Sequence, residues 1–134
     1  MAHKRWIKDE RGFTLVEIIA VLIILGILAA VAVPRYIDLE TNARQRALDA
    51  AVSELNGRES LHWANLKISS SGYTDDAALF AGLDTDLGAD YTWAGLGVGG
   101  GTLTFKTSST VILARTASTA TKPAVWRSPN TPTP

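Results

Sequence analysis

The sequence contains no cysteine, and only one methionine and two histidines stand among its 134 residues. The absence of cysteine excludes disulfide bonds, thiolate chemistry and cysteine-based metal sites. The formal net charge is zero, so no overall electrostatic attraction favours nucleic acid as a main partner. Hydrophobic residues make up 46% of the chain and charged residues 19%, a balance that excludes a wholly disordered protein.

Residue patterns of catalytic centres are missing as well. No serine lies in a nucleophile-elbow pattern. The glycine-rich run at residues 95–101 lacks the Lys-Ser/Thr pair of a phosphate-binding loop, so we expect a flexible loop there. His62-Trp63 is expected to pack a helix against the rest of the domain rather than to bind a ligand. The sequence therefore predicts a protein that is not an enzyme and has no cofactor.

Apolar residues are concentrated near the N-terminus. Residues 18–33 contain no charged and no strongly polar side chain. The 21 residues 13–33 span roughly 30 Å as a helix, about the thickness of one hydrocarbon core. Residues 1–12 carry four Lys and Arg against two acidic residues, and such a basic segment stays on the cytoplasmic side. We predict a membrane-inserted helix; a secretory signal cut near residues 29–32 is disfavoured, because the apolar run continues into a helical pattern.

One carboxylate, Glu17, lies near the start of this apolar run. Insertion scales give a cost of roughly 2.5–3.5 kcal/mol for a charged residue at the centre of a membrane helix, and less near the interface. Glu17 is therefore either a plain interfacial residue or a carboxylate that awaits a cation from another chain.

The residues around Glu17 resemble the processing site of type IV prepilins and type II secretion pseudopilins. The matching residues are Arg11-Gly12-Phe13-Thr14-Leu15-Val16-Glu17, with Gly26, Pro34 and Tyr36 downstream. In that family a membrane peptidase cuts after the glycine and methylates the new amino terminus. The resemblance implies a cut after Gly12 and N-methylation of Phe13. It also implies that Glu17 neutralises the terminal amine of a neighbouring subunit, since in low dielectric both charges gain from pairing.

The helix should continue well beyond the apolar run. From residue 35 the pattern is amphipathic, with Leu48, Ala51 and Leu55 near one face. Gly26 and Pro34 weaken a helix, by nearly 1 and about 3 kcal/mol respectively. An isolated subunit should keep the helix, with at most a kink. The resemblance implies that residues 26–34 lose helical structure when subunits pack.

The C-terminal half is richer in Thr, Ser, Gly and Asp, which predicts a small antiparallel sheet. We predict strands at residues 102–107, 110–116 and 124–127, a short helix at 75–81, otherwise loop over 73–101, and a loose tail at 128–134. The sheet should pack on the helix through Leu103 and Phe105.

The family resemblance also draws attention to an acidic loop, because the major pseudopilin typically carries a calcium-binding loop. Asp84, Asp86 and Asp90 follow the spacing Asp-x-Asp-x-x-x-Asp and could offer oxygen ligands. The terminal bidentate glutamate of an EF-hand loop is absent. We therefore prefer a solvated acidic loop and keep these three residues as weak calcium candidates.

The predicted fold is α+β and pilin-like, with a long N-terminal helix, transmembrane in its first half, packed on a small antiparallel sheet. Its predicted parts are a prepilin leader (residues 1–12), a transmembrane or filament-core helix (13–34), an amphipathic helix (35–67) and a small head with a proline-rich tail (68–134).

The resemblance implies a structural subunit of a type IV pilus-like filament. The implied partners are further copies of the chain, the prepilin peptidase/methyltransferase and the inner-membrane assembly machinery. The precursor would lie in the bacterial inner membrane and the assembled product in an extracellular pilus. Two alternatives stay open. One is a type II secretion pseudopilin in a periplasmic pseudopilus, and the other is a non-polymerising single-pass membrane protein whose head binds a ligand.

Overall fold

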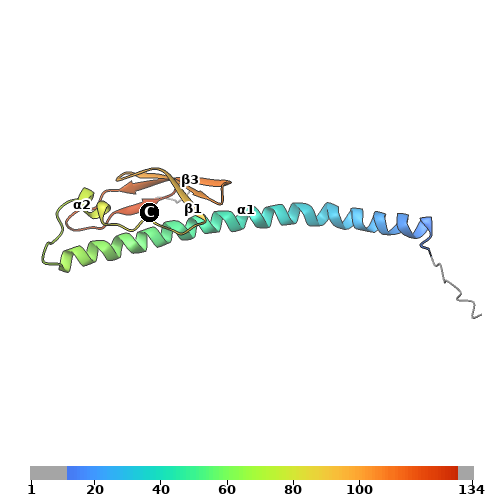
Figure 1. Ribbon diagram of the computed structural model, residues 1–134, viewed down its shortest axis with the longest axis horizontal. Helices are drawn as coiled ribbons and strands as arrows, with labels where there is room; N and C mark the ends of the chain where they lie inside the picture. Colours follow the sequence, from blue (N-terminus) through green and yellow to red (C-terminus); the bar gives the residue numbers. More distant parts are fainter. Residues whose placement is uncertain (1–11, 130–134) are drawn as a thin grey trace, which may run out of the picture. The chain divides into compact units, whose positions relative to one another are not determined.

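One long helix precedes a small sheet in the part of the chain that the structure describes, residues 12–129 (Figure 1). This structure is a computed structural model. Its elements are α1 (Leu15–Ile68), α2 (Asp76–Ala81), β1 (Tyr91–Gly97), β2 (Gly100–Phe105), β3 (Ser109–Thr116) and β4 (Val125–Arg127). The chain divides into two units, Met1–Leu39 and Glu40–Pro134. The second, which we call the head unit, holds the C-terminal part of α1, α2 and the sheet. The predicted α+β fold is confirmed.

Helix α1 runs without interruption through residues that weaken helices. Pro34 lies inside it, and so do Gly26 and Gly57. A proline in a helix interior costs about 3 kcal/mol and a glycine about 1. Packing of an amphipathic face usually supplies more helical stability than propensity does. The residues near Gly57 have such packing, since Leu55 and Glu59 are buried.

The four strands form one antiparallel sheet in the order β1-β2-β3-β4. The strands predicted from alternating residues correspond to β2, β3 and β4, and the predicted short helix corresponds to α2. Ser128, placed by the sequence in a loose tail, is buried, whereas residues 130–134 of that tail lie outside the described part.

Strand β1 was not predicted, because residues 73–101 were expected to be loop apart from a short helix. The glycines at its end lower strand propensity, yet Tyr91 and Trp93 alternate with small residues and turn toward the core. The expected flexible glycine-rich loop is instead the β1–β2 hairpin, in which Gly97 pairs with Gly100. Gly100 has φ +118°, and a Cβ there would lie 2.0 Å from the carbonyl oxygen of Leu113. Only glycine fits this position.

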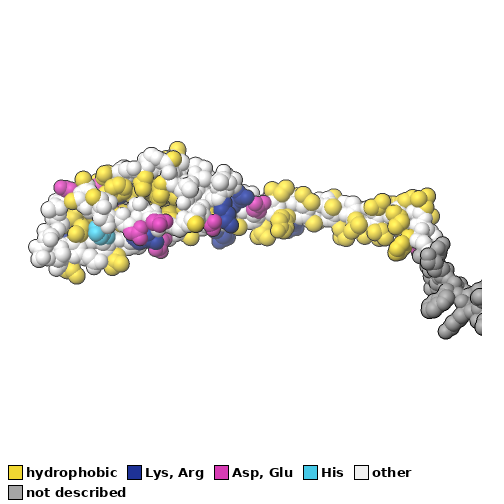
Figure 2. Space-filling view, viewed as in Figure 1, with side chains coloured by type: hydrophobic (Ala, Val, Ile, Leu, Met, Phe, Trp, Pro, Cys, Tyr) yellow, Lys and Arg dark blue, Asp and Glu magenta, His cyan; other side chains and the backbone are white. Residues whose placement is uncertain are grey.

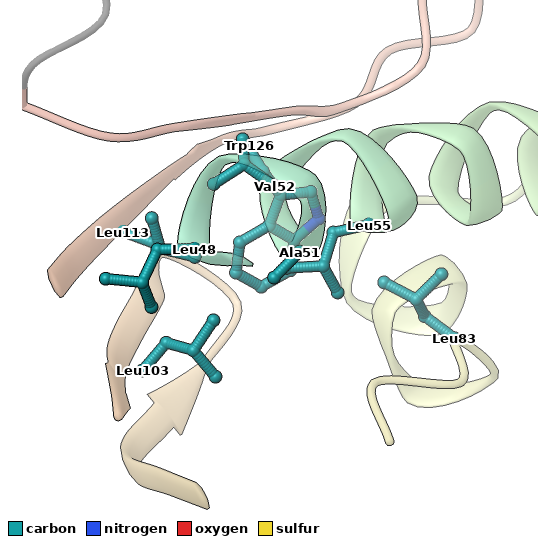
Figure 3. Packing of buried hydrophobic residues seen from close by; sticks show 8 residues of the cluster. All are labelled: Leu48, Ala51, Val52, Leu55, Leu83, Leu103, Leu113 and Trp126. Carbon is teal, nitrogen blue, oxygen red and sulfur yellow. The ribbon is translucent and has the colours of Figure 1, made fainter. Parts of the chain in front are cut away.

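The hydrophobic core lies between α1 and the sheet within the head unit (Figure 3). Each fully buried leucine contributes about 1.5–3 kcal/mol relative to exposure. The sheet side chains alternate, so Leu103 and Leu113 point inward, whereas Ile112 is 68% exposed. The core residues are Leu48, Ala51, Val52 and Leu55 from α1, Leu83 from the following loop, and Leu103, Leu113 and Trp126 from the sheet. The predicted apolar face of the helix is thus confirmed at Leu48, Ala51 and Leu55.

A buried ion cluster lies beside this core, and it is not among the features that the sequence predicts. Glu59 on α1 is fully buried and accepts hydrogen bonds from Arg115 Nη2 (2.7 Å) and Nε (3.1 Å) and from Trp126 Nε1 (3.0 Å). Arg115 also donates to both oxygens of Asp76, each at 2.9 Å. Ser118 donates to Asp76 through its backbone N–H (2.7 Å) and its hydroxyl (2.6 Å). The cluster therefore ties together α1, α2, β3 and β4.

The pKa values of two cluster members follow from these contacts. Burial alone would raise the pKa of Asp76, but the hydrogen bonds from Arg115 and Ser118 outweigh it and hold the pKa below its ordinary value. Burial would lower the pKa of Arg115, but Glu59 and Asp76 raise it above its ordinary value. Asp76 and Arg115 are therefore charged at neutral pH. No buried side-chain nitrogen or oxygen of residues 12–129 lacks a hydrogen-bond partner.

The chain beyond β3 is held to α1 by polar side chains. The carboxamide of Asn56 accepts from the backbone N–H of Trp126 (2.8 Å) and donates to its carbonyl (3.0 Å). Trp63 Nε1 donates to the carbonyl of Thr119 at 2.9 Å. His62 lies against Gly82, where a Cβ would come within 2.8 Å of Nε2. The expected packing of His62 and Trp63 against the head is confirmed.

Candidate assembly site

Helix α1 begins with a capping box formed by Thr14 and Glu17. The Glu17 carboxylate accepts hydrogen bonds from the backbone N–H of Thr14 (2.8 Å) and from its hydroxyl (3.0 Å). The Thr14 hydroxyl accepts in return from the backbone N–H of Glu17, at 3.2 Å. This reciprocal pattern satisfies N–H groups that a helix N-terminus otherwise leaves unpaired. The sequence carries the signal for this cap, because Thr-x-x-Glu before an apolar run is typical of a helix N-terminus.

The cap stabilises the Glu17 carboxylate. The sequence alone identifies no partner for Glu17 in its own chain, whereas in the structure Thr14 donates two hydrogen bonds to it. An acidic residue in the first turn also interacts favourably with the helix dipole, by about 0.3–1 kcal/mol. Glu17 therefore has hydrogen-bond partners within its own chain.

Gly12 and Phe13, the residues on either side of the predicted cut, precede the helix. A Cβ at Gly12 would meet no atom within 4 Å, and Phe13 is 83% exposed. The bond between them is thus not enclosed by any described residue. Residues 1–11 of the predicted leader lie outside the described part of the chain.

The N-terminal part of α1 presents apolar side chains along the face that Figure 2 shows. Its large apolar residues between 15 and 33 are 44–77% exposed. By length and composition, α1 is the one helix in residues 12–129 that can cross a membrane, and none of its apolar window is buried. Gly26 and Pro34 lie inside this segment, in helical conformation. A helix that is apolar all round needs a lipid or protein environment.

The side chain of Arg58 binds the acidic loop of the head unit. Arg58 Nη1 lies 3.1 Å from the carboxylate of Asp84 and donates to the carbonyls of Asp84 (3.3 Å) and Asp86 (2.7 Å). The hydrogen bond with Glu54, 2.8 Å long, holds the pKa of Arg58 above its ordinary value. The carbonyl of Asp90 is used by the backbone N–H of Lys106 (2.9 Å).

No group of three His, Cys, Asp or Glu side chains within residues 12–129 is arranged to hold a metal ion. A calcium site at Asp84, Asp86 and Asp90 stays a prediction from the resemblance. Arg58 contacts a carboxylate oxygen of Asp84 and the carbonyls of Asp84 and Asp86, so it would compete with calcium for these oxygens.

Comparison with known proteins places the N-terminal features in a family. The family described as "Prokaryotic N-terminal methylation motif" matches residues 7–33, the range that includes Gly12, Phe13, the cap and the apolar run. The "Type IV narrow pilus major component PilA5" of Thermus thermophilus is 32% identical over 83 residues, which cover 62% of this chain and 68% of that protein. The chain belongs to the type IV pilin family.

Other relatives of this pilin are similar over shorter shares of their length. A "Fimbrial protein" of Pseudomonas aeruginosa is 34% identical over 85 residues, covering 54% of each chain. The "Type IV major pilin protein PilA" of Myxococcus xanthus is 42% identical over 45 residues, covering 34% of this pilin and 20% of that protein. No solved structure gives a significant match. The predicted resemblance is confirmed, and the pilin family is structural rather than enzymatic.

Proposed function

We propose that this pilin is a polymerising subunit of a type IV pilus, made as a membrane precursor and processed at its N-terminus. The observation that carries the proposal is the accessible Gly12-Phe13 bond directly before a capped helix with an exposed apolar surface. In this proposal the prepilin peptidase cuts the bond and methylates Phe13. The inner-membrane assembly machinery then moves the subunit from the inner membrane into an extracellular pilus.

The apolar surface of α1 would provide the driving force for polymerisation. Burial of apolar area contributes roughly 25 cal/mol per Å², and the exposed side chains of residues 15–33 have no cover in one chain. Lipid covers them in the precursor, and the same segments of other copies would cover them in the filament. The free-energy cost of removing these side chains from lipid would then be offset by their burial among the helices of neighbouring copies.

The amine that cleavage creates on Phe13 would meet Glu17 of a neighbouring subunit. A carboxylate already held by its own capping box must exchange one or both Thr14 hydrogen bonds for that amine. The exchange is favourable in an apolar surrounding, where two opposite charges attract more strongly than in water. Glu17 would thus act twice, first as a helix cap and then as an ion-pair partner.

The intact mass of the native protein tests the processing step. We expect the loss of residues 1–12 and the gain of one methyl group on Phe13. Cells without prepilin peptidase should yield the full chain, which is the control. A native protein that retains its first twelve residues would contradict the proposal and favour the non-polymerising membrane protein.

The variant Glu17→Val tests the pairing step. It should insert in the membrane normally, because an apolar valine side chain is favourable in lipid. The number of filaments counted by electron microscopy should fall at least about tenfold, which corresponds to a loss of about 1.4 kcal/mol of assembly free energy. Thr14→Ala is the matched control, since it breaks the cap but leaves the carboxylate, and it should still form filaments. Normal filament numbers with Glu17→Val would refute the pairing.

A further inference from the structure

One carboxamide of α1 holds the last strand of the head unit, and the residue that follows it is a glycine. The side chain of Asn56 accepts a hydrogen bond from the backbone N–H of Trp126 (2.8 Å) and donates one to the carbonyl of the same residue (3.0 Å). Trp126 is only 1% exposed and lies among the core residues of α1 (Figure 3). Gly57 follows Asn56 directly. The docking of β4 on α1 therefore depends on the side chain of an Asn-Gly pair.

Gly57 has no steric role within residues 12–129. A Cβ at this position would meet no atom within 4 Å. The backbone is helical there, and glycine is less favourable than alanine in a helix interior. The packing of the described residues thus does not require glycine at position 57. What glycine does change is the reactivity of the asparagine before it.

We propose that Asn56-Gly57 is a modification site at which the unfolded chain deamidates itself, and that the folded head unit blocks the reaction. The backbone nitrogen of Gly57 attacks Cγ of Asn56, loses its proton and forms the new C–N bond of a succinimide ring. The C–N bond of the carboxamide breaks, and ammonia leaves. Water then opens the ring to aspartate or isoaspartate. The reaction consumes a water molecule and releases an ammonia molecule, with no oxidant or reductant.

Glycine makes the ring closure easier than other following residues do. It has no side chain to obstruct the approach of its own nitrogen, and its backbone is the least restricted of all residues. Asn42 and Asn65 lie in the same helix, but Ala43 and Leu66 follow them. These two asparagines are therefore internal references of lower reactivity.

The folded head unit restrains both reacting groups. In an α-helix the N–H of residue 57 points to the carbonyl four residues earlier, so ring closure needs a rotation about the backbone of Asn56 that breaks the helix. The carboxamide is held by Trp126 at both its nitrogen and its oxygen. Leu55 and Glu59 on the same turns are fully buried. This part of α1 opens only when the head unit opens, and the reaction has to wait for that opening.

The product cannot hold β4 as Asn56 does. Asparagine offers donor and acceptor groups, whereas ionised aspartate only accepts. A carboxylate oxygen would face the carbonyl oxygen of Trp126, where an N–H now donates at 3.0 Å. The new charge would also lie on the helix side that carries the buried Glu59, three residues further on. Isoaspartate adds an atom to the backbone and interrupts α1. A chain that has been unfolded for long would therefore carry a permanent change that weakens its head unit.

The test follows Asn56 in the full chain, solubilised in detergent and incubated at mildly alkaline pH with and without a denaturing concentration of urea. Peptide mass spectrometry measures the replacement of the amide by an acid at each asparagine. Conversion of Asn56 should be at least about tenfold slower without urea, because it then waits for the small open fraction of the head unit. In urea, Asn56 should convert faster than Asn42 and Asn65, and Gly57→Ala should remove that difference.

Refolding after the incubation tests the consequence for stability. The converted chain should unfold at a lower urea concentration than a chain that was unfolded only briefly, as followed by tryptophan fluorescence. Gly57→Ala, incubated for the same time, is the matched control. It should keep its own midpoint, since its Asn56 stays intact and the added Cβ has room. Asn56→Asp should show the lowered midpoint without any incubation, and failure of this variant to fold would agree with the same loss of β4 docking.

Three results would overturn the inference. One is equal conversion of Asn56 in the folded and the unfolded chain. Another is conversion of Asn56 in urea no faster than that of Asn42. The third is a converted chain with an unchanged urea midpoint. The inference concerns the head unit alone, so none of these results bears on cleavage at Gly12 or on polymerisation.

Discussion

Glu59 shows how strongly one residue can hold the head unit. Its carboxylate is fully buried and bonded to Arg115 and Trp126. Glu59→Gln keeps the volume but removes the charge, so Arg115 retains Asp76 as its counter-charge. Breaking one partner of a buried pair costs about 3–5 kcal/mol, and we expect the unfolding free energy to fall by up to about 3 kcal/mol for this conservative change.

Glu54 on the same helix is the matched control, because it is exposed and its ion pair with Arg58 lies at the surface. Exposed pairs contribute at most about 1 kcal/mol, so Glu54→Gln should change the unfolding free energy by less than that. Urea unfolding of the detergent-solubilised chain, followed by tryptophan fluorescence, measures both variants. Equal midpoints for the two would show that the head unit does not need the charge of Glu59.

Asp76 predicts how the head unit responds to acid. Its pKa in the folded chain lies below the unfolded value of about 3.9, because the bonds from Arg115 and Ser118 outweigh burial. The stabilisation is therefore complete above about pH 4 and is lost as the pH falls through the lower folded value. We expect a constant urea midpoint from about pH 7 to pH 5 and a decline below about pH 4. In Asp76→Asn the acid decline should be shallower, and an identical slope would contradict the assignment.

Among the elements, α1 combines a well-packed half and a weakened half. The half in the head unit packs Leu48 and Leu55 on the sheet, whereas residues 26–34 rely on backbone bonds that Gly26 and Pro34 weaken. We propose that this segment extends when subunits pack. Hydrogen–deuterium exchange of assembled filaments should be faster at residues 26–34 than at residues 48–55. Equal protection of both segments would count against extension.

The elements also show what the sequence could and could not predict. Strands β2 and β3 are recognisable by alternation, as in Thr102-Leu103-Thr104-Phe105. Strand β1 is not recognisable in this way. Its glycines, which the hairpin requires, obscure the alternating pattern of the two aromatic residues that face the core. The Thr14 cap could have been predicted from spacing alone. The partner of Glu59 could not, since Arg115 is 56 positions away and only the completed fold brings them together.

At the scale of the whole molecule, a chain without cysteine must hold its C-terminal segment by other means. Asn56, Glu59, Trp63 and Lys67 on α1 all bind that segment or its neighbours, Lys67 through the carbonyl of Ala120 at 2.9 Å. Their spacing of three or four residues places them in one line along the helix. This polar line runs beside the apolar one that makes the core, so α1 organises the head unit through two parallel stripes.

The hydrogen bonds of Asn56 have a consequence for the tendency of the head unit to aggregate. A sheet edge with free backbone groups is a template on which identical strands can add and form amyloid. At one edge the Asn56 carboxamide occupies the N–H and carbonyl of Trp126. At the other edge, β1 is irregular between Ala94 and Gly97, and such a bulge hinders strand addition. With both edges blunted, addition of identical strands is hindered, so the filament growth that we propose would proceed without competition from amyloid-like growth.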